Sequence, residues 1–151
     1  MSLITKKYLP KHDLQRIADT IARIESATSG EIRVCVRQKR FLGEGKLSLH
    51  DLMLKEFYRL GMDRTKDRTG VLILLLLDEK KFEIIGDEGI DKKIPEGTWD
   101  RIAESMSAHF REGKFAEGIL HAIDEVGNDL KKHFPRRSDD RNELSNDVVE
   151  E

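Results

Sequence analysis

The stretch Gly70–Gly86, GVLILLLLDEKKFEIIG, decides the fold. Its continuous apolar run, Val71–Leu77, indicates a strand that is buried on both faces, as at the centre of an α/β sheet. The turn residues Asp78–Lys80 follow, and Lys81–Ile85 is predicted to be the second arm of a β-hairpin. Because a helix needs ~20 apolar residues to span a bilayer, this run predicts no transmembrane segment.

The sequence around this hairpin adds a parallel strand and several helices. Glu31–Arg37 alternates apolar and polar residues and is predicted to be a strand, and Leu49–Leu60 has the apolar spacing of a helix. With Val71–Leu77 they form a βαβ unit with a right-handed crossover. Helical spacing also predicts helices at Lys11–Thr28, Thr98–Arg111 and Phe115–Phe134. The predicted fold is an α/β three-layer sandwich, whose mixed central sheet (a βαβ unit plus a hairpin) is flanked by helices.

The length and the charge of the chain limit its possible domain organisation and its possible partners. The 151 residues fit one domain. The chain has 27 Lys and Arg against 29 Asp and Glu, a balance without the basic excess of a nucleic-acid binder. Residues 1–135 are predicted to form the domain, and residues 136–151, with three Arg and six acidic residues, a disordered acidic tail. The beginning of the sequence lacks a long apolar segment, so we expect no secretory signal and a cytoplasmic protein.

Two features near the first strand look chemical and are predicted to be structural. Cys35 is the single cysteine, so no internal disulfide is possible, and its place on the strand indicates a small buried hydrophobic residue. The basic run Arg37–Arg40 is predicted to be a solvated edge of the sheet.

The strand directions bring acidic loops to one end of the sheet. The two parallel strands begin at that end, and the hairpin's second strand ends there. Four carboxylates can converge at this rim, with two further candidates beside them: Glu31, Asp67, Asp87 and Asp91, then Glu88 and Glu96. Ca²⁺ and Mg²⁺ prefer oxygen ligands, and the glycines of these loops let the backbone fold around an ion. The pattern therefore predicts a calcium or magnesium site.

Ordinary turn formation explains the same residues in another way. Asp and Gly are common turn residues, because of local hydrogen bonding and permissive backbone angles. Asp63–Gly70 also lacks the ligand spacing of an EF-hand. Open α/β sheets usually bind ligands at the carboxyl ends of their parallel strands, whereas this rim lies at the amino ends. Spacing alone therefore leaves both interpretations open.

Several segments, in order, resemble the TPM domain family over about residues 10–135. They are Thr28–Ile32, Asp67–Leu72, Ile85–Asp91, Phe110–Ile119 and His133–Pro135. The resemblance implies a sheet between helices. Members of that family include thylakoid proteins linked to photosystem II repair, one described as an acid phosphatase, and bacterial proteins that are often membrane-anchored. Divalent metal binding in acidic loops has been described for some.

The family pattern also assigns residues. It places acidic residues at Asp67, Asp91 and Glu96, and an arginine that could bind phosphate at Arg101. This sequence has Asp67-Arg68-Thr69-Gly70 where Asp-Asn-Gly is frequent, and Asp87-Glu88 where Gly-Tyr is frequent. The second change adds negative charge and favours a cation.

Two functional hypotheses follow. The first is a divalent-cation-binding domain, with weak metal-dependent phosphatase activity as its enzymatic version, in which the ion polarises a phosphoryl oxygen. The second is a non-enzymatic accessory domain, in which a sheet edge or a helix face binds a protein partner at a membrane. Cation binding is favoured over catalysis, because an acidic cluster without an identifiable nucleophile is weak evidence for an enzyme.

Overall fold

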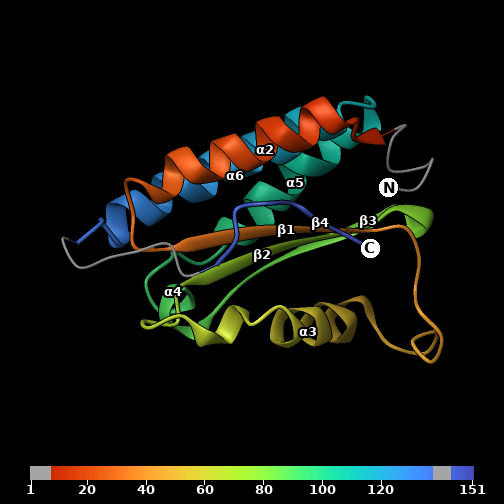
Figure 1. Cartoon of the computed structure of the whole chain (residues 1–151), viewed down its shortest axis with the longest axis horizontal. Coiled ribbons are helices and arrows are strands. Elements are labelled where there is room, and N and C mark those ends of the chain that lie inside the picture. The colour runs from red at the N-terminus through yellow and green to blue at the C-terminus, as the bar shows by residue number, and fades with distance from the viewer. Residues whose placement is uncertain (1–7, 138–143) are drawn as a thin grey trace.

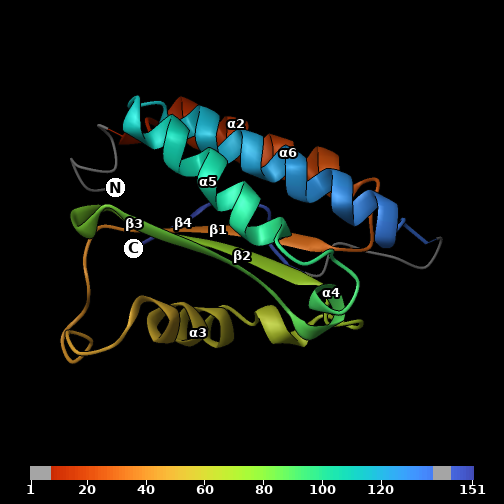
Figure 2. The same ribbon diagram turned by 180° about the vertical axis from the view of Figure 1, so that it is seen from behind.

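The computed structural model describes residues 8–137 and 144–151, which form three layers (Figures 1 and 2). The middle layer is a four-stranded sheet in the order β3-β2-β1-β4. Its strands are β1 (Glu31–Arg37), β2 (Gly70–Leu76), β3 (Lys81–Gly86) and β4 (Val149–Glu150). One face is covered by α2 (Lys11–Glu25), α5 (Thr98–Arg111) and α6 (Phe115–His133), and the other by α3 (Leu49–Arg59). Among the described residues, the connections contain three short helices: η1 (Met62–Arg64), η2 (Leu77–Glu79) and α4 (Glu88–Asp91).

The pairing of the strands confirms the predicted sandwich. β1 runs parallel to β2, with Glu31 opposite Gly70, and β2 pairs antiparallel with β3, with Val71 opposite Gly86. The βαβ unit and the hairpin are therefore both present. The apolar run ends one residue early as a strand, because Leu77 begins the short helix η2 that makes the turn.

Residues of β2 alternate between two apolar clusters, which explains why the strand has no polar interruption. Val71, Ile73 and Leu75 pack in the cluster under α2, α5 and α6. Leu72 and Leu74 pack in the cluster under α3. All seven residues of β2 are buried. A strand covered by a helical layer on each side requires apolar residues at every position.

The helices follow their predicted spans closely, and their packing explains a helical glycine. A Cβ added at Gly127 on α6 would lie 2.7 Å from Ile24 Cδ1 on α2, so glycine permits the close approach of these two helices. One loop was predicted incompletely: residues 88–91 form α4, whose first turn is capped by Asp87. Among the residues described, no helix is both long and apolar enough to cross a bilayer.

The end of the chain differs from the predicted disordered tail. Residues 138–143 lie outside the described residues, but within residues 144–151 Val149 and Glu150 pair with β1 in parallel. The low average hydropathy of this segment hides one aliphatic pair, Val148–Val149, which packs against both layers. The exposed backbone edge of β1 supplies the remaining hydrogen bonds, so order arises here from a surface that is remote in sequence.

Candidate functional site

Backbone hydrogen bonds join three loops at the end of the sheet where β1 and β2 begin. The amide of Glu31 donates to Thr69 O (3.1 Å), and the amide of Asp87 donates to Gly70 O (2.8 Å). The amide of Gly89 donates to Arg68 O (3.0 Å). The segments that the strand directions bring together therefore meet, and α4 lies at this rim (Figure 2).

Gly89 makes the closest approach between two of these loops. A Cβ at this position would lie 2.3 Å from Asp67 O and 2.6 Å from Arg68 O. Any side chain there would force the loops apart, so glycine is needed for close contact between backbones. The geometry packs two carbonyl oxygens of the loop before β2 against the start of α4.

Arg68 neutralises the buried carboxylate of this rim. Its guanidinium donates to both oxygens of Asp87, from Nε at 2.7 Å and from Nη2 at 2.9 Å, and Nη1 lies 3.7 Å from Glu88 Oε1. Asp87 Oδ1 also accepts from the amide of Glu88 (2.8 Å). The hydrogen bond to Asp87 raises the pKa of Arg68 above its ordinary value. Asp87, one of the metal ligands predicted from the sequence, is thus already paired with a positive charge.

The other predicted ligands are placed separately. Asp67 pairs with Arg137 and lines a hollow of about 380 Å³ beside Gly89. Asp91 Oδ1 accepts from Trp99 Nε1 (3.1 Å). The three remaining candidates of the rim and its neighbourhood are exposed: Glu88, Glu96 and Arg101. Their roles as metal or phosphate ligands stay predictions.

Glu31 belongs to a buried carboxyl pair that sequence reasoning did not anticipate. Its side chain hydrogen-bonds to that of Glu25, the last residue of α2, and the two residues are 2% and 5% exposed. Burial, then the hydrogen bond with Glu31, raises the pKa of Glu25 to about 9. Glu25 Oε2 also accepts from the amide of Ile32 (3.0 Å). The pair therefore holds a proton at neutral pH and joins α2 to β1.

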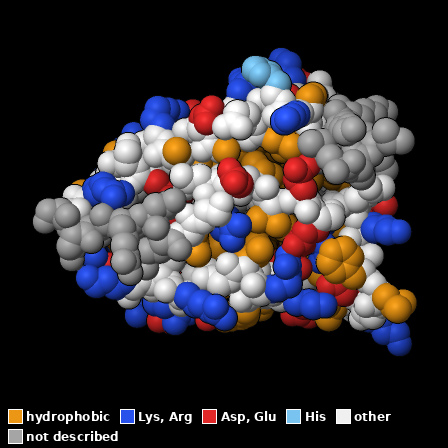
Figure 3. All heavy atoms as spheres, in the orientation of Figure 1, with side chains coloured by type: hydrophobic (Ala, Val, Ile, Leu, Met, Phe, Trp, Pro, Cys, Tyr) orange, Lys and Arg blue, Asp and Glu red, His pale blue; other side chains and the backbone are white. Residues whose placement is uncertain are grey.

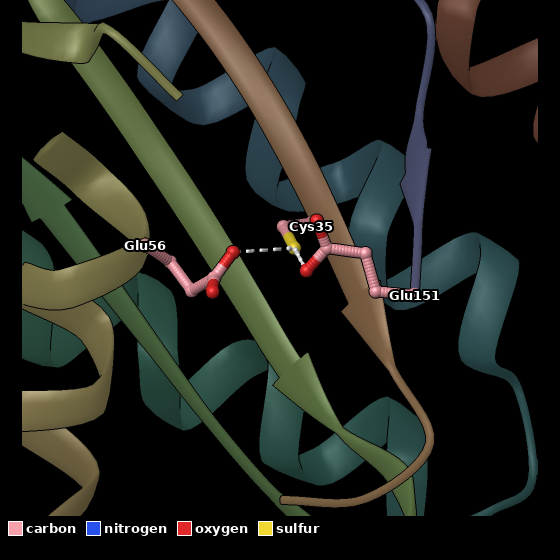
Figure 4. A group of neighbouring side chains, drawn as sticks. All are labelled: Cys35, Glu56 and Glu151. Atoms are coloured by element: carbon pink, nitrogen blue, oxygen red, sulfur yellow. Dashed lines mark hydrogen bonds between the residues drawn. The ribbon is translucent and has the colours of Figure 1, made fainter. Parts of the chain in front are cut away.

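A second cluster lies between β1 and α3 and contains Cys35, Glu56 and Glu151 (Figure 4). Cys35 Sγ lies 3.9 Å from Glu56 Oε2 and 3.7 Å from Glu151 Oε2. Among the described residues it is the one group of three acidic, Cys or His side chains whose potential ligand atoms lie within 4.8 Å of one another. None of the metal ligands predicted from the sequence belongs to it.

The chemistry of this cluster fits an ion-pair network better than a metal site. Burial, then the charge of Glu56, raises the pKa of the Cys35 thiol to about 12. Arg59 Nη2 lies 2.6 Å from Glu56 Oε2 and also pairs with Glu151. The arginine supplies the positive charge between the carboxylates. The prediction that Cys35 is a buried small residue is confirmed.

The prediction of a solvated basic run at residues 37–40 was wrong for Arg37. This residue is 0% exposed and pairs with the buried carboxylate of Glu44, while its Nη1 lies 3.5 Å from Glu56 Oε1. Burial alone would raise the pKa of Glu44, but hydrogen bonds from Arg37, Lys55 and the amide of Phe41 outweigh it and lower the pKa to about 2. The signal available in the sequence was that Arg37 is the last residue of the predicted strand and follows the apolar Val36.

Comparison with known proteins identifies the fold and its family. The model of the TPM domain matches residues 4–129. The chain belongs to the TPM domain family. Among curated proteins, none matches this sequence.

Solved TPM-fold structures share the architecture. The NMR structure of the BA42 protein from the psychrophilic bacterium Bizionia argentinensis is 33% identical, with a TM-score of 0.85 and 95% of each chain covered. The N-terminal domain of a protein from P. gingivalis is 25% identical with a TM-score of 0.67, covering 83% of this chain and 78% of that one. The N-terminal domain of cg2496 from Corynebacterium glutamicum, at 15% identity and a TM-score of 0.52, shares the fold over 79% of this chain and 70% of its own.

Proposed function

We propose that this TPM domain binds a divalent cation, Ca²⁺ or Mg²⁺, at the rim where β1 and β2 begin. The observation that supports the proposal is the backbone hydrogen bonding between the loops. The amide of Gly89 donates to Arg68 O, and the amide of Asp87 donates to Gly70 O. These bonds join the backbones of two loops that carry acidic residues, Asp67 on one and Asp87, Glu88 and Asp91 on the other. Hard divalent cations take such oxygen ligands.

The rim binds a cation by exchanging one positive charge for another. Asp87 is held by Arg68, so an ion that engages this carboxylate must displace the guanidinium. Asp67 and Glu88 have exposed side chains, 41% and 61%, and can turn toward an incoming ion. Because the guanidinium must be displaced, the affinity for the cation is modest: each contact that the ion gains replaces an existing ion pair. The proposed role of the cation is to order these loops rather than to catalyse a reaction.

A thermal-shift titration with Ca²⁺, Mg²⁺ and EDTA tests the proposal. A ligand that binds only the folded state at ten times its Kd contributes about 1.4 kcal/mol, which raises Tm by roughly 3–6 °C in a domain of this size. We expect Asp67→Asn and Glu88→Gln to reduce the shift. Asp78→Asn, which makes the same chemical change in the exposed turn after β2, is the matched control and keeps it.

Arg68→Asn is the most informative variant. It removes the internal counter-ion of Asp87, so the protein without added cation is expected to melt at a lower temperature and the cation-dependent shift to grow. If neither ion raises Tm in the parent chain or in Arg68→Asn, the proposal is wrong. Cation-dependent turnover of an aryl phosphate, lost in Asp67→Asn, would extend it to metal-dependent phosphatase activity.

A further inference from the structure

The two edges of the sheet are closed in different ways. The edge strand β3 carries the exposed Lys81 and the half-buried Glu83, charged residues of the kind that discourage strand addition. On the other side, every residue of β1 except Arg33 is buried. A strand with mostly buried side chains and an open backbone edge would pair readily with another chain, so this edge needs a cover.

Residues 144–151 cover this edge, but few contacts attach them to it. β4 places two residues opposite β1, which has seven. Beyond this pairing, the amide of Glu151 donates to Val36 O (2.8 Å) and the amide of Gln38 donates to Glu151 O (3.0 Å). None of residues 144–151 is buried. A segment with few buried contacts and few backbone hydrogen bonds opens at much lower free energy than the core.

The side chains of this segment define what the edge recognises. Val148 packs against the cluster under α2, α5 and α6, whereas Val149 and Leu144 pack against the cluster under α3. Glu151 reaches Arg59 on α3, and Figure 4 shows its carboxylate beside Cys35. The recognised pattern is therefore two adjacent aliphatic residues, any residue, and then a carboxylate.

We propose that the outer edge of β1 is a binding site for an extended acidic segment of a partner protein, which adds as a parallel strand and displaces residues 144–151. Strand addition of this kind takes its affinity from backbone hydrogen bonds and its specificity from alternate side chains. The chain's own segment occupies the site in cis and limits access to partners that carry the same pattern.

Charge complementarity selects an acidic partner. Residues 144–151 contain three acidic residues, Asp147, Glu150 and Glu151, and no basic residue. The guanidinium of Arg59, 46% exposed, receives the last of them. In the orientation of Figure 1 this edge faces the reader, and Figure 3 shows basic, acidic and apolar side chains interspersed over that face. A basic strand would leave Arg59 facing a like charge.

The test uses the full chain and a labelled peptide, Leu-Ser-Asn-Asp-Val-Val-Glu-Glu, with the sequence of residues 144–151. Val149→Asp in the full chain removes the aliphatic contact of the cis segment, and Ser145→Asp, at an exposed position, adds the same charge as a control. If the cis segment closes the edge 90–99% of the time, opening it strengthens peptide binding roughly ten- to a hundredfold. We expect this gain in Val149→Asp and not in Ser145→Asp.

Amide hydrogen exchange locates the binding and works on the parent chain too. The Gln38 amide, which donates to Glu151 O, should exchange much faster than the Glu31 amide, which donates to Thr69 O between β1 and β2. Exchange of Gln38 should accelerate in Val149→Asp and slow again when peptide is added. A peptide with lysine in place of its last glutamate should bind at least about tenfold more weakly, a loss typical of a charge pair turned into a repulsion.

Four results would overturn the proposal. The first is equal protection of the Gln38 and Glu31 amides in the parent chain, because the segment would then open only with the whole fold. The second is no binding of the peptide to Val149→Asp at millimolar concentration, and the third is equal binding to both variants. The fourth is a concentration-dependent dimer of Val149→Asp with a protected Gln38 amide, which would make a second copy the occupant.

Discussion

Replacing Glu25 by glutamine tests the carboxyl pair that joins the end of α2 to the start of β1. The pKa of Glu25 is raised from 4.5 to about 9, first by burial and then by the hydrogen bond with Glu31. Between these values the folded chain holds a proton that the unfolded chain has lost. The stabilisation from this proton is complete below the pKa of Glu25 in the unfolded chain. It is lost as the pH rises through the pKa of Glu25 in the folded chain, with a slope of about 1.4 kcal/mol per pH unit for one proton.

The amide introduced by Glu25→Gln can accept from the Ile32 amide and donate to Glu31, as the protonated acid does, but it does not titrate. Urea unfolding between pH 5 and 8 should therefore give similar stability for parent and variant at pH 5. The variant should then gain about 1.4 kcal/mol over the parent with each pH unit. Glu117→Gln, at an exposed position on α6, should follow the parent. Parallel curves for Glu25→Gln and the parent would refute the shared proton.

Three further predictions concern packing, ion pairing and thiol reactivity. Gly89→Ala places a Cβ 2.3 Å from Asp67 O and should lower the free energy of unfolding by about 1–3 kcal/mol in urea; an unchanged value would mean that the loops separate freely. Glu44→Gln removes the carboxylate that pairs with the buried Arg37 and should cost about 3–5 kcal/mol. Because the pKa of Glu44 is lowered to about 2, the parent should also lose stability as the pH falls from 4.5 toward 2, and this loss should shrink in the variant. Cys35, 0% exposed and with its pKa raised to about 12, should react with a thiol reagent only at the rate of opening, so faster labelling at pH 8 would contradict its burial.

Hydrophobic periodicity was enough to predict the architecture, because the long strands and helices repeat their apolar pattern over many residues. β2 is apolar at every position since it lies between two helical layers, and this can be read without knowing what covers it. Two classes of feature could not be read this way. α4 is one turn long, too short for a periodic pattern, and β4 is ordered by its contact with β1 rather than by its own sequence.

Ion pairing was the harder class, because a sequence shows charges but not their partners. Arg68 and Asp87 are 19 residues apart, and Arg37 meets Glu44 across a loop. Counting acids along the chain therefore shows where carboxylates occur in the sequence, but not which of them an arginine already neutralises. The same reasoning made Glu31 a candidate metal ligand at the rim, whereas its buried neighbour Glu25 turns the two into a proton-sharing pair.

The position of Arg68 decides how the rim can use a cation. A cluster of uncompensated carboxylates would repel itself and bind a divalent ion by relieving that repulsion. Here the guanidinium already relieves it at Asp87, from a residue with a positive φ of 57°. An ion gains only the difference between its own contacts and those of the arginine. Cation binding at this rim is therefore a competition between two positive charges, and it should weaken as added salt screens the attraction between the divalent ion and the carboxylates.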